Sequence, residues 1–503
     1  MLPCNRRFCK KNTYVNSRTP FPRCINSGNF IIINVNLARI PFSLHNSNSM
    51  SDHKVIFLFL THPSHCSDVL RSKLLTSLAD DFVVVVFTPT LDENRANAEG
   101  YPQGENIIYK RRSVSHPKFW MIFDKYLRIP FVREFDHLSY VRWFYKRPHS
   151  SLRKFLMNIG ALLPRRIARS AAFTWLERII MPISKEFLHH VCMYKPSIVV
   201  TATPGFTIFE AEAITFAKKL GIITVAINLN YDNLSSNLKM IRKTDYLVVW
   251  NSRMKEEALT LHSYNNRNVI VAGCLRFDHY FEDDDAKMTK EEFLESKSLD
   301  PKKKMLLFTS PTPSNYPMRQ LLMKHLIQLI NGRFKDSLSL LVRIHPIDTM
   351  ESYKEFVHVP NVCIERAGQS VVPTDVALGQ KIEMNIGARR NLKKSLQCAD
   401  VVVNFASTMI IEASIFNRPV INISFPPERA IVYDYEYNKA LVESGAVRMA
   451  YTPEELGDAI GDYLAHPERD SEKRQTMIRS YVPFNDGMNW RRIHDFLAKL
   501  LEK

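Results

Sequence analysis

The sequence predicts an α/β protein with two halves, each built around a parallel β-sheet. Three observations support this prediction. From Met50 onward, short β-branched runs alternate with longer helical patterns, which is typical of parallel α/β folds. The alternation occurs twice, and a charged stretch at residues 281–304 separates the two series. No uncharged apolar run reaches the ~18 residues that a membrane-spanning helix needs, so the runs are strand-sized.

The first half is expected to span residues 50–280. Its candidate strands are Lys54–Thr61, Phe82–Thr88, Ile198–Thr203, Ile222–Ile227, Tyr246–Trp250 and Val269–Ala272. Helical patterns separate these strands, and the pattern at Phe209–Leu220 ends at Gly221. A glycine in that place typically closes a helix in the left-handed conformation.

The second half is expected at residues 305–482, followed by a last segment at 483–503. Its candidate strands are Met305–Thr309, Leu338–Ile344, Val362–Glu365, Val401–Phe405, Val420–Ile423 and Val447–Ala450. Helical patterns occur at Arg319–Ile330, Met409–Phe416 and Glu454–His466, and an amphipathic helix at Met488–Lys503 closes the chain.

Residues 1–49 differ from the remainder because they carry seven bases and no acid. They lack the order of charged, apolar and small residues that marks a signal peptide. We expect a basic extension outside the fold, disordered or not native, with Met50 as the true start. The five cysteines after it form no Cys-x-x-Cys pair, which favours a reducing, cytoplasmic location and neither a disulfide framework nor a metal site.

The chain has a net charge of +17, and after residues 1–49 a second basic zone, His137–Leu176, contains eight bases and no acid. Aromatic and aliphatic residues are interleaved with its bases, so the zone fits an amphipathic helix on an anionic membrane or a surface for an anionic acceptor. A solvated helical face is the alternative, and nucleic-acid binding is disfavoured because no such module is visible. The bases are Arg142, Lys146, Arg147, Arg153, Lys154, Arg165, Arg166 and Arg169.

Several common catalytic motifs are missing from the sequence. There is no phosphate-binding GxxxxGK[ST] loop, no GxGxxG, no HExxH and no GxSxG. A binding site is therefore expected at the strand ends, since ligands of parallel sheets bind beyond the carboxyl ends of the strands.

The strongest candidate site follows the expected strand Val401–Phe405. Ser407 and Thr408 precede a helix and can cap it, while small residues let a diphosphate approach the free amides. Glu412 lies about one turn into that helix, where its carboxylate can accept a hydrogen bond from ribose hydroxyls. An ordinary strand, cap and helix is the alternative interpretation.

This segment resembles the donor-nucleotide signature of GT-B glycosyltransferases, and the sequences Val271–Asp278, Thr309–Pro311 and Leu341–Pro346 agree with it. The resemblance extends to the glycerophosphotransferases of the same fold, which move a polyol phosphate from a cytidine diphosphate donor. It implies two Rossmann-like, doubly wound domains that face a cleft. The first would bind the acceptor and the second the donor, and the last helix would pack back on the first domain.

The resemblance also implies roles for individual residues of the second domain. Groups that hold the donor phosphates or its ribose would be Ser407, Thr408, Glu412, Arg343, His345, Thr309 and Ser310. In the first domain, inverting members of the fold often place a catalytic base in the loop after the opening strand. There we expect His62 as the base, with His65 as the second choice, because a histidine has a suitable pKa. Asp232 could orient an acceptor hydroxyl or a histidine, or form a simple turn.

The sequence therefore predicts a glycosyltransferase that moves a sugar from a nucleotide-diphosphate donor to a glycan or lipid-linked acceptor, without a metal ion or cofactor. The alternatives are a CDP-glycerol-type glycerophosphotransferase, a nucleotide-sugar epimerase and a non-catalytic protein that binds a membrane or polymer. We expect a cytoplasmic protein with a peripheral contact to an anionic membrane, and no nucleic-acid partner.

Overall fold

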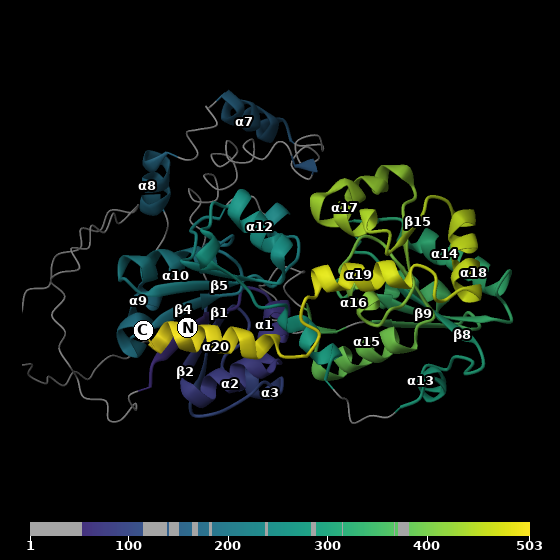
Figure 1. Cartoon of the computed structure of the whole chain (residues 1–503), viewed down its shortest axis with the longest axis horizontal. Helices are drawn as coiled ribbons and strands as arrows, with labels where there is room; N and C mark the ends of the chain where they lie inside the picture. The colour runs from purple at the N-terminus through teal and green to yellow at the C-terminus, as the bar shows by residue number, and fades with distance from the viewer. Residues whose placement is uncertain are drawn as a thin grey trace, which may run out of the picture. The chain divides into compact units, whose positions relative to one another are not determined.

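A computed structural model shows two fully parallel sheets of seven and six strands and one short antiparallel pair (Figure 1). The predicted fold class, an α/β protein with two parallel-sheet domains, is confirmed. The structure describes residues 53–113, 138–139, 150–162, 170–180, 184–236, 240–282, 288–313, 315–366, 368–370 and 382–502.

The first sheet has the strand order β3-β2-β1-β4-β5-β6-β7. The chain begins in the middle, runs outward to one edge and then crosses over to build the other side, so the order reverses between β1 and β4. Ligands of doubly wound sheets bind at such a reversal. The strands are β1 (Val55–Phe59), β2 (Val83–Thr88), β3 (Ile107–Arg111), β4 (Ile198–Thr201), β5 (Ile223–Ile227), β6 (Tyr246–Val249) and β7 (Val269–Val271).

The second sheet repeats this plan with the order β10-β9-β8-β13-β14-β15, and its reversal lies between β8 and β13. Its strands are β8 (Lys304–Thr309), β9 (Leu338–Ile344), β10 (Val362–Arg366), β13 (Val401–Asn404), β14 (Val420–Ile423) and β15 (Arg448–Ala450). The antiparallel pair is β11 (Gln369–Ser370) with β12 (Ile382–Glu383).

All twelve predicted strands are present, and the sequence analysis missed β3, β11 and β12. Strand β3 is an edge strand whose last residues, Lys110 and Arg111, are charged and partly exposed. An edge strand needs only one buried face, so its apolar run is too short to stand out.

Helices cover both faces of the first sheet, and alternation along β1 shows this. Ile56 and Leu58 belong to one buried cluster, while Phe57 and Phe59 belong to another. Successive side chains of a strand point to opposite faces, so both faces are buried and the strand is apolar throughout. The helices of this domain are α1 (Pro63–Leu70), α2 (Lys73–Asp81), α3 (Glu93–Ala98), α7 (Ser151–Leu162), α8 (Ala171–Ile180), α9 (Lys185–Tyr194), α10 (Ile208–Lys219), α11 (Asn233–Ser236), α12 (Ser252–Thr260) and the short 3-10 helices η4 (Asn266–Asn268) and η5 (Leu275–Tyr280).

The second sheet is covered in the same way, since Leu306 and Phe308 of β8 pack into one cluster and Met305 and Leu307 into another. Its helices are α13 (Lys290–Ser296), α14 (Arg319–Asn331), η6 (Met350–Phe356), α15 (Ile386–Cys398), α16 (Met409–Ile415), η8 (Pro427–Asp434), α17 (Glu436–Glu443), α18 (Pro453–Ala465) and α19 (Ser471–Tyr481). In the first domain, the predicted glycine stop is also present, because Gly221 follows α10 with a φ of +74°.

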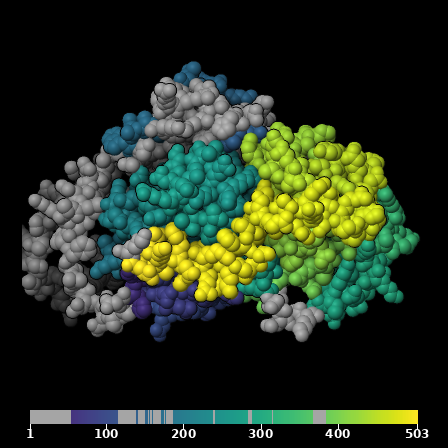
Figure 2. All heavy atoms as spheres, in the orientation of Figure 1, coloured from purple at the N-terminus to yellow at the C-terminus, as the bar shows by residue number. Residues whose placement is uncertain are grey.

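The last helix, α20 (Asn489–Glu502), packs on the first domain, as the resemblance implied. Figure 2 shows it on the surface against the first residues of the fold. Asp278 of η5 caps the start of α20. The two carboxylate oxygens of Asp278 accept hydrogen bonds from the N–H groups of Asn489 (3.2 Å) and Trp490 (2.9 Å). Ile493 and Leu497 then enter the same cluster as β1. A carboxylate at a helix start and an apolar stripe fix the helix in place.

Candidate functional site

A pocket lies at the carboxyl ends of β8, β9 and β13, where the strand order of the second sheet reverses. It encloses about 550 Å³, including space that is open to solvent. Among the described residues that line it, none is acidic, and five carry polar groups that the sequence analysis had singled out. The lining consists of Thr309, Ser310, Pro311, Thr312, Asn315, Arg343, Ile344, His345, Pro346, Phe405, Ala406, Ser407 and Met409.

The turn between β13 and α16 forms one wall of this pocket. Ala406 has a φ of +42°, a left-handed conformation that is rare for a residue with a side chain. The Ser407 hydroxyl caps α16, because its Oγ accepts a hydrogen bond from the Met409 N–H at 3.2 Å. Thr408 occupies the formal cap position, yet its hydroxyl makes no capping bond. Of the two cap residues that the sequence suggested, Ser407 is therefore the one that acts.

Asn404 connects two polar walls of the pocket, and the sequence analysis missed it. Its Oδ1 accepts hydrogen bonds from Thr309 Oγ1 at 3.0 Å and from Ser407 Oγ at 3.1 Å. Its Nδ2 donates to Oδ1 of Asn422 on β14 at 3.4 Å. Both asparagines are buried within apolar strands, which is the signal that could have drawn attention to them.

His345 lies at the end of β9 and presents a neutral imidazole. Its Nδ1 accepts a hydrogen bond from the Ile347 N–H at 3.2 Å, so the ring proton resides on Nε2. Burial lowers the pKa of His345 to about 4, against a smaller opposing effect of Asp348. At neutral pH the ring is therefore an uncharged hydrogen-bond donor at the pocket.

Arg343 is buried at the same strand end and is ion-paired with Glu365. Glu365 also accepts bonds from Lys297 Nζ at 2.5 Å and from Asn391 Nδ2 at 2.9 and 3.0 Å. Burial alone would raise the pKa of Glu365, but Arg343 and Lys297 outweigh it and hold that pKa below the usual value. Two cations share one carboxylate, so the cluster behind the pocket carries net positive charge.

Ser310 is tied to a buried network that the sequence analysis also missed. Its Oγ accepts a hydrogen bond from the His345 N–H at 3.0 Å and lies 3.2 Å from the Tyr353 hydroxyl. Tyr353 in turn lies 3.0 Å from Oδ2 of Asp348, which is ion-paired with Arg319. The network anchors the end of β8 to η6.

Glu412 is buried and does not line the pocket. One carboxylate oxygen accepts a hydrogen bond from the Thr408 hydroxyl at 3.1 Å, and the other accepts one from the Tyr280 hydroxyl of η5. In this arrangement Glu412 joins α16 to the end of the first domain. Its role in ribose binding stays a prediction.

Further polar contacts join α1 to η5 and to the second domain. Arg276 makes a bidentate ion pair with Asp68 on α1, at 2.7 to 3.2 Å. Arg389 on α15 donates to the Ser67 carbonyl at 2.8 Å. The helix that follows the predicted base, α1, thus contacts both η5 and α15.

The two histidines of that loop follow β1, at the reversal of the first sheet. Burial lowers the pKa of His62, which begins α1. Burial, and then the charges of His62 and Arg276, lower the pKa of His65 well below its usual value. Their ring centroids are 5.0 Å apart, and neither ring nitrogen of the fully buried His65 has a partner among the described residues. Both rings are neutral near pH 7, the state that a general base requires.

A buried carboxylate, Glu210 on α10, stands next to this loop and was missed. It accepts hydrogen bonds from the Thr203 N–H at 3.0 Å, from the Thr203 hydroxyl and from the Thr207 hydroxyl at 3.3 Å. Burial outweighs these bonds and raises its pKa to about 7. The Thr207-x-x-Glu210 spacing is that of a helix-capping box, which is a sequence signal for its position.

Asp232 lies in the loop after β5, and burial raises its pKa. Its Oδ2 accepts a hydrogen bond from the Ser236 hydroxyl at 3.3 Å, which supports the turn interpretation. Its neighbour Tyr231 donates to Oδ1 of Asn438 in α17 at 2.9 Å, so this loop contacts the second domain.

Comparison with known protein families then decides the family. Residues 177–499, more than half of the chain, match the model of the CDP-glycerol:poly(glycerophosphate) glycerophosphotransferase family. The chain belongs to that family. It is a transferase, as predicted, and the family is the one that the sequence analysis held as the alternative to sugar transfer. The match includes the pocket and Glu210, whereas the His62 loop lies outside it.

Solved structures that share the fold of this family member have little sequence in common with it. The S. aureus MnaA–UDP complex is 14% identical with a TM-score of 0.52, and the alignment covers 89% of this chain and 97% of that one. A putative UDP-N-acetylglucosamine 2-epimerase from Listeria monocytogenes is 12% identical with a TM-score of 0.52, and the alignment covers 90% of this chain and 97% of that one. A histidine-to-alanine variant of the wall teichoic acid polymerase TagF is 9% identical with a TM-score of 0.51, and the alignment covers 90% of this chain and 89% of that one. At such identities the likeness shows the fold alone. No curated protein sequence matches the chain.

The basic zone of this family member is only partly described. Lys154 lies exposed on α7, and Arg153 lies on the same helix. The other predicted bases lie outside the described residues: Arg142, Lys146, Arg147, Arg165, Arg166 and Arg169. Within the described ranges, no helix combines the length and apolar character needed to cross a membrane.

The described part of the chain contains no group of three or more metal-ligating side chains. Its five cysteines, Cys66, Cys192, Cys274, Cys363 and Cys398, are free thiols. These two findings concern the described residues alone.

Proposed function

We propose that this glycerophosphotransferase-family protein transfers a polyol phosphate from a CDP-activated donor, of the CDP-glycerol type, to a hydroxyl group of a growing polymer or a lipid-linked acceptor. The observation that carries the proposal is the family match over residues 177–499, which contains the whole pocket. The pocket's chemistry supports it, because an anionic donor needs hydrogen-bond donors and positive charge, and its described lining includes no acid.

In the proposed complex, the diphosphate lies in the pocket of the second domain. The Nε2–H of His345 donates to a phosphate oxygen, and the cluster of Arg343, Lys297 and Glu365 supplies net positive charge behind it. These groups stabilise the negative charge that develops on the departing nucleotide, so a metal ion is not required.

His62 is the proposed general base. The acceptor hydroxyl attacks the phosphorus atom that carries the polyol, and a new oxygen–phosphorus bond forms. The bond between this phosphorus atom and the oxygen that bridges the two phosphorus atoms breaks. CMP leaves with that oxygen, and the acceptor proton moves to His62. Burial favours the neutral imidazole that this step needs.

The donor is tested by thermal unfolding of residues 50–503 with CDP-glycerol, CDP, UDP-N-acetylglucosamine, UDP and GDP. A ligand at 100 times its Kd adds roughly 2.7 kcal/mol of stability. A selective shift with the cytidine ligands supports the proposal. A selective shift with UDP-N-acetylglucosamine would replace it with the sugar transfer or epimerisation that the sequence also allowed. Cytidine binding without turnover on any acceptor would indicate a non-catalytic protein.

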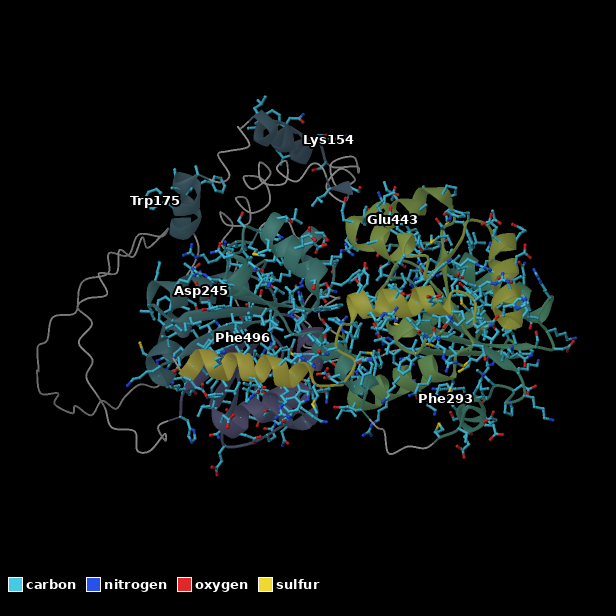
Figure 3. All side chains as sticks on the ribbon, viewed as in Figure 1. Lys154, Trp175, Asp245, Phe293, Glu443 and Phe496 are labelled. Carbon is cyan, nitrogen blue, oxygen red and sulfur yellow. The ribbon has the colours of Figure 1, made fainter. Side chains whose placement is uncertain are left out.

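We also propose that α7 contacts an anionic membrane surface at which a lipid-linked acceptor is presented. Four apolar side chains on one face of α7 are exposed: Leu152 (63%), Phe155 (60%), Ile159 (45%) and Leu162 (84%). Their spacing of three or four residues makes a continuous stripe, and the helix carries bases and no acid. On α8, Trp175 is also exposed, and Figure 3 labels it together with Lys154.

Sedimentation with vesicles tests this contact. We expect binding to vesicles that contain anionic phosphatidylglycerol and weak binding to phosphatidylcholine alone, because positive charge and apolar area act together. Phe155→Glu should release the protein, whereas Leu321→Glu, at an apolar position on α14 that is 44% exposed, should not. Binding that is indifferent to Phe155→Glu would contradict the proposal. Binding to RNA with a steep salt dependence would favour a nucleic-acid role.

A further inference from the structure

We propose that Arg276 is a further catalytic residue, whose guanidinium group binds the non-bridging oxygens of the phosphoryl group during its transfer. This inference rests on the proposed function and extends it. In the proposed reaction, His345 and the Arg343 cluster act on the departing nucleotide, and His62 takes the acceptor proton. The charged oxygens on the phosphorus atom under attack still need a partner. Asp68 is the positioning residue that orients Arg276 for this contact.

The chemistry of phosphoryl transfer creates the need for such a group. While one oxygen–phosphorus bond forms and the other breaks, negative charge is spread over the equatorial oxygens of the transferred group. A guanidinium group suits these oxygens because its coplanar N–H groups can bind two of them at once. The residue that supplies it has to lie where the acceptor side and the donor side of the protein meet.

Arg276 is held along one edge of its guanidinium group. Its Nε and Nη2 donate to the two carboxylate oxygens of Asp68 at 2.7 to 3.2 Å, and Nη2 lies 3.4 Å from Oδ1 of Asn230. Among the described residues, Nη1 has no hydrogen-bond partner. Asp68 is buried, whereas 21% of the Arg276 side chain is exposed. The ion pair thus fixes the plane of the guanidinium group and leaves the N–H groups of Nη1 for a ligand.

These contacts place Arg276 where the two domains meet. Its partner Asp68 lies on α1, the helix that follows His62. Four residues after Arg276 on η5, the Tyr280 hydroxyl donates to Glu412 of α16. The turn that precedes α16 lines the donor pocket. Arg276 is therefore linked on one side to the helix of the proposed base and on the other side to the helix that begins at the donor pocket.

Electrostatic effects agree with this position. Burial, and then the charges of His62 and Arg276, lower the pKa of His65, so the charge of Arg276 acts on the loop of the proposed base. Burial would lower the pKa of Arg276 itself, but Asp68 and then Glu412 outweigh it and raise that pKa. The guanidinium group therefore stays charged, and it interacts with groups from both domains.

Two further cations lie near η5, on helix α15. Burial, and then the charges of Arg389, Lys393 and Arg276, lower the pKa of His279 to about 3, against an opposing hydrogen bond to the Arg276 carbonyl. Arg389 and Lys393 are both buried, and Arg389 forms no ion pair within the described part of the chain. Three positive charges around one short helix favour an anionic group. Arg276 is thus more than one half of a neutral ion pair.

Turnover of the full chain, with CDP-glycerol as donor and a poly(glycerophosphate) primer as acceptor, tests the proposal. Arg276→Lys keeps a positive charge beside Asp68, but one ammonium group cannot both hold Asp68 and present a second donor edge. We expect kcat to fall about 10²-fold, the usual loss for one donor to transition-state charge, with donor Kd and acceptor KM within about threefold of wild type. Unchanged kcat would overturn the proposal. A raised acceptor KM at unchanged kcat would also overturn it, because Arg276 would then bind the acceptor's own phosphate.

Arg253 on α12 provides a matched control. Its side chain is 27% exposed and ion-paired with Glu257, and it reaches the second domain through the Tyr481 hydroxyl (2.6 Å) and the Glu436 carbonyl (2.7 Å). Arg253→Lys should leave kcat within about threefold of wild type, since these contacts are structural. Equal losses in Arg276→Lys and Arg253→Lys would mean that looser domain contacts explain both, which would overturn the proposal.

Chemical rescue separates contact with the substrate from a structural role. Arg276→Ala leaves a space beside Asp68 that a guanidinium ion fits, so guanidinium chloride at millimolar concentration should raise kcat of this variant about 10-fold. Ethylammonium chloride, which lacks the planar fork, should not, and the unfolding temperature should be the same in both salts. Absence of rescue in a folded Arg276→Ala variant would overturn the proposal. If that variant does not fold, Arg276→Lys decides.

Failure of the proposed function is distinguishable from failure of this inference. If the wild-type protein transfers no polyol phosphate from CDP-glycerol, both are overturned. If the wild-type protein does so and Arg276→Lys retains its kcat, the proposed function stands and only the role of Arg276 is wrong.

Discussion

The carboxyl ends of the two sheets carry different chemistry. At the first sheet, burial shifts the pKa values of the half-buried His62 and of the buried His65 and Glu210, and His65 has no hydrogen-bond partner among the described residues. At the second sheet, Thr309 and Ser407 are hydroxyls that do not titrate near neutral pH, and both are tied to Asn404. Glu210, with a pKa of about 7, can exchange a proton near neutral pH at the first sheet end, whereas the two hydroxyls at the second sheet end are fixed.

This difference indicates a division of labour between two copies of one topology. Proton transfer needs a group whose pKa lies near the working pH and whose proton is free to move. Binding needs donors and acceptors that are oriented before the ligand arrives, because orientation costs free energy on binding. The first sheet end has a titrating group of the kind that proton transfer needs. The second sheet end has the oriented groups that binding needs. Substitutions at each sheet end test that division.

His62→Ala should reduce turnover most, by about 10²- to 10⁴-fold, which is the usual contribution of a general base. Donor affinity should stay unchanged, since His62 belongs to the other sheet end. Steady-state rates with CDP-glycerol and calorimetric Kd values check both parts. The exposed His189 on α9 provides a control, and His189→Ala should behave like the wild-type protein. A turnover rate within threefold of wild type would remove His62 from the mechanism.

Glu210→Gln should change how stability depends on pH. Burial raises the pKa of Glu210 from 4.5 to about 7, so the folded protein binds more protons than the unfolded chain between these values. Stability of the wild-type protein therefore falls as pH rises through this window, by ~3 kcal/mol from this group, and is constant above it. The variant lacks this contribution.

Urea unfolding at pH 5 and pH 8 measures this effect. The variant should gain stability relative to wild type on going to pH 8, whatever its offset at pH 5 from the altered bonds to Thr203. An equal difference at both pH values would mean that Glu210 is ionised throughout, and the first sheet end would lose one of its titrating groups.

Much of the fold could be predicted because it depends on local pattern. Strands such as Leu338–Ile344 and Val420–Ile423 were predicted at their observed bounds, since both are buried apolar runs between clear helical patterns. The strand-end rule, together with the family resemblance, then led to Thr309, Ser310, Arg343, His345 and Ser407, which line one pocket. Residues at the ends of adjacent parallel strands meet whatever the sequence distance between them.

The missing part of the site depends on contacts that no pattern reports. Asn404 and Tyr353 were overlooked because each sits among apolar residues and acts only through partners that are distant in the sequence. Glu412 was singled out as an acid within an apolar helix, yet its contact with Tyr280 required the three-dimensional structure. Burial of a polar group can be suspected from sequence, but its partner cannot.

Arg343→Gln should weaken donor binding by about 10- to 100-fold, because it removes a charge from the cluster behind the pocket. Turnover at saturating donor should fall as well, because the same charge stabilises the departing nucleotide. Glu365 retains Lys297 and Asn391, so the protein should still fold. Arg333→Gln removes an exposed ion pair with Asp458 on the same domain and serves as the control. Turnover at saturating donor equal to that of the wild-type protein would limit Arg343 to donor binding.

The smallest effect is expected for the pH dependence of donor affinity. Burial lowers the pKa of His345 to about 4, so this ring stays neutral from pH 5.5 to 8.5 and its Nε2–H donates throughout. CDP-glycerol has no terminal phosphate that titrates in this range, so its Kd should vary by less than about twofold. Turnover, in contrast, should fall on the acid side as His62 becomes protonated, below its ordinary pKa of 6.5 because burial lowers it. If affinity instead tightens as pH falls through 6.5, a histidine at the second sheet end is gaining charge. The two sheet ends would then share the titrating chemistry that we assign to one of them.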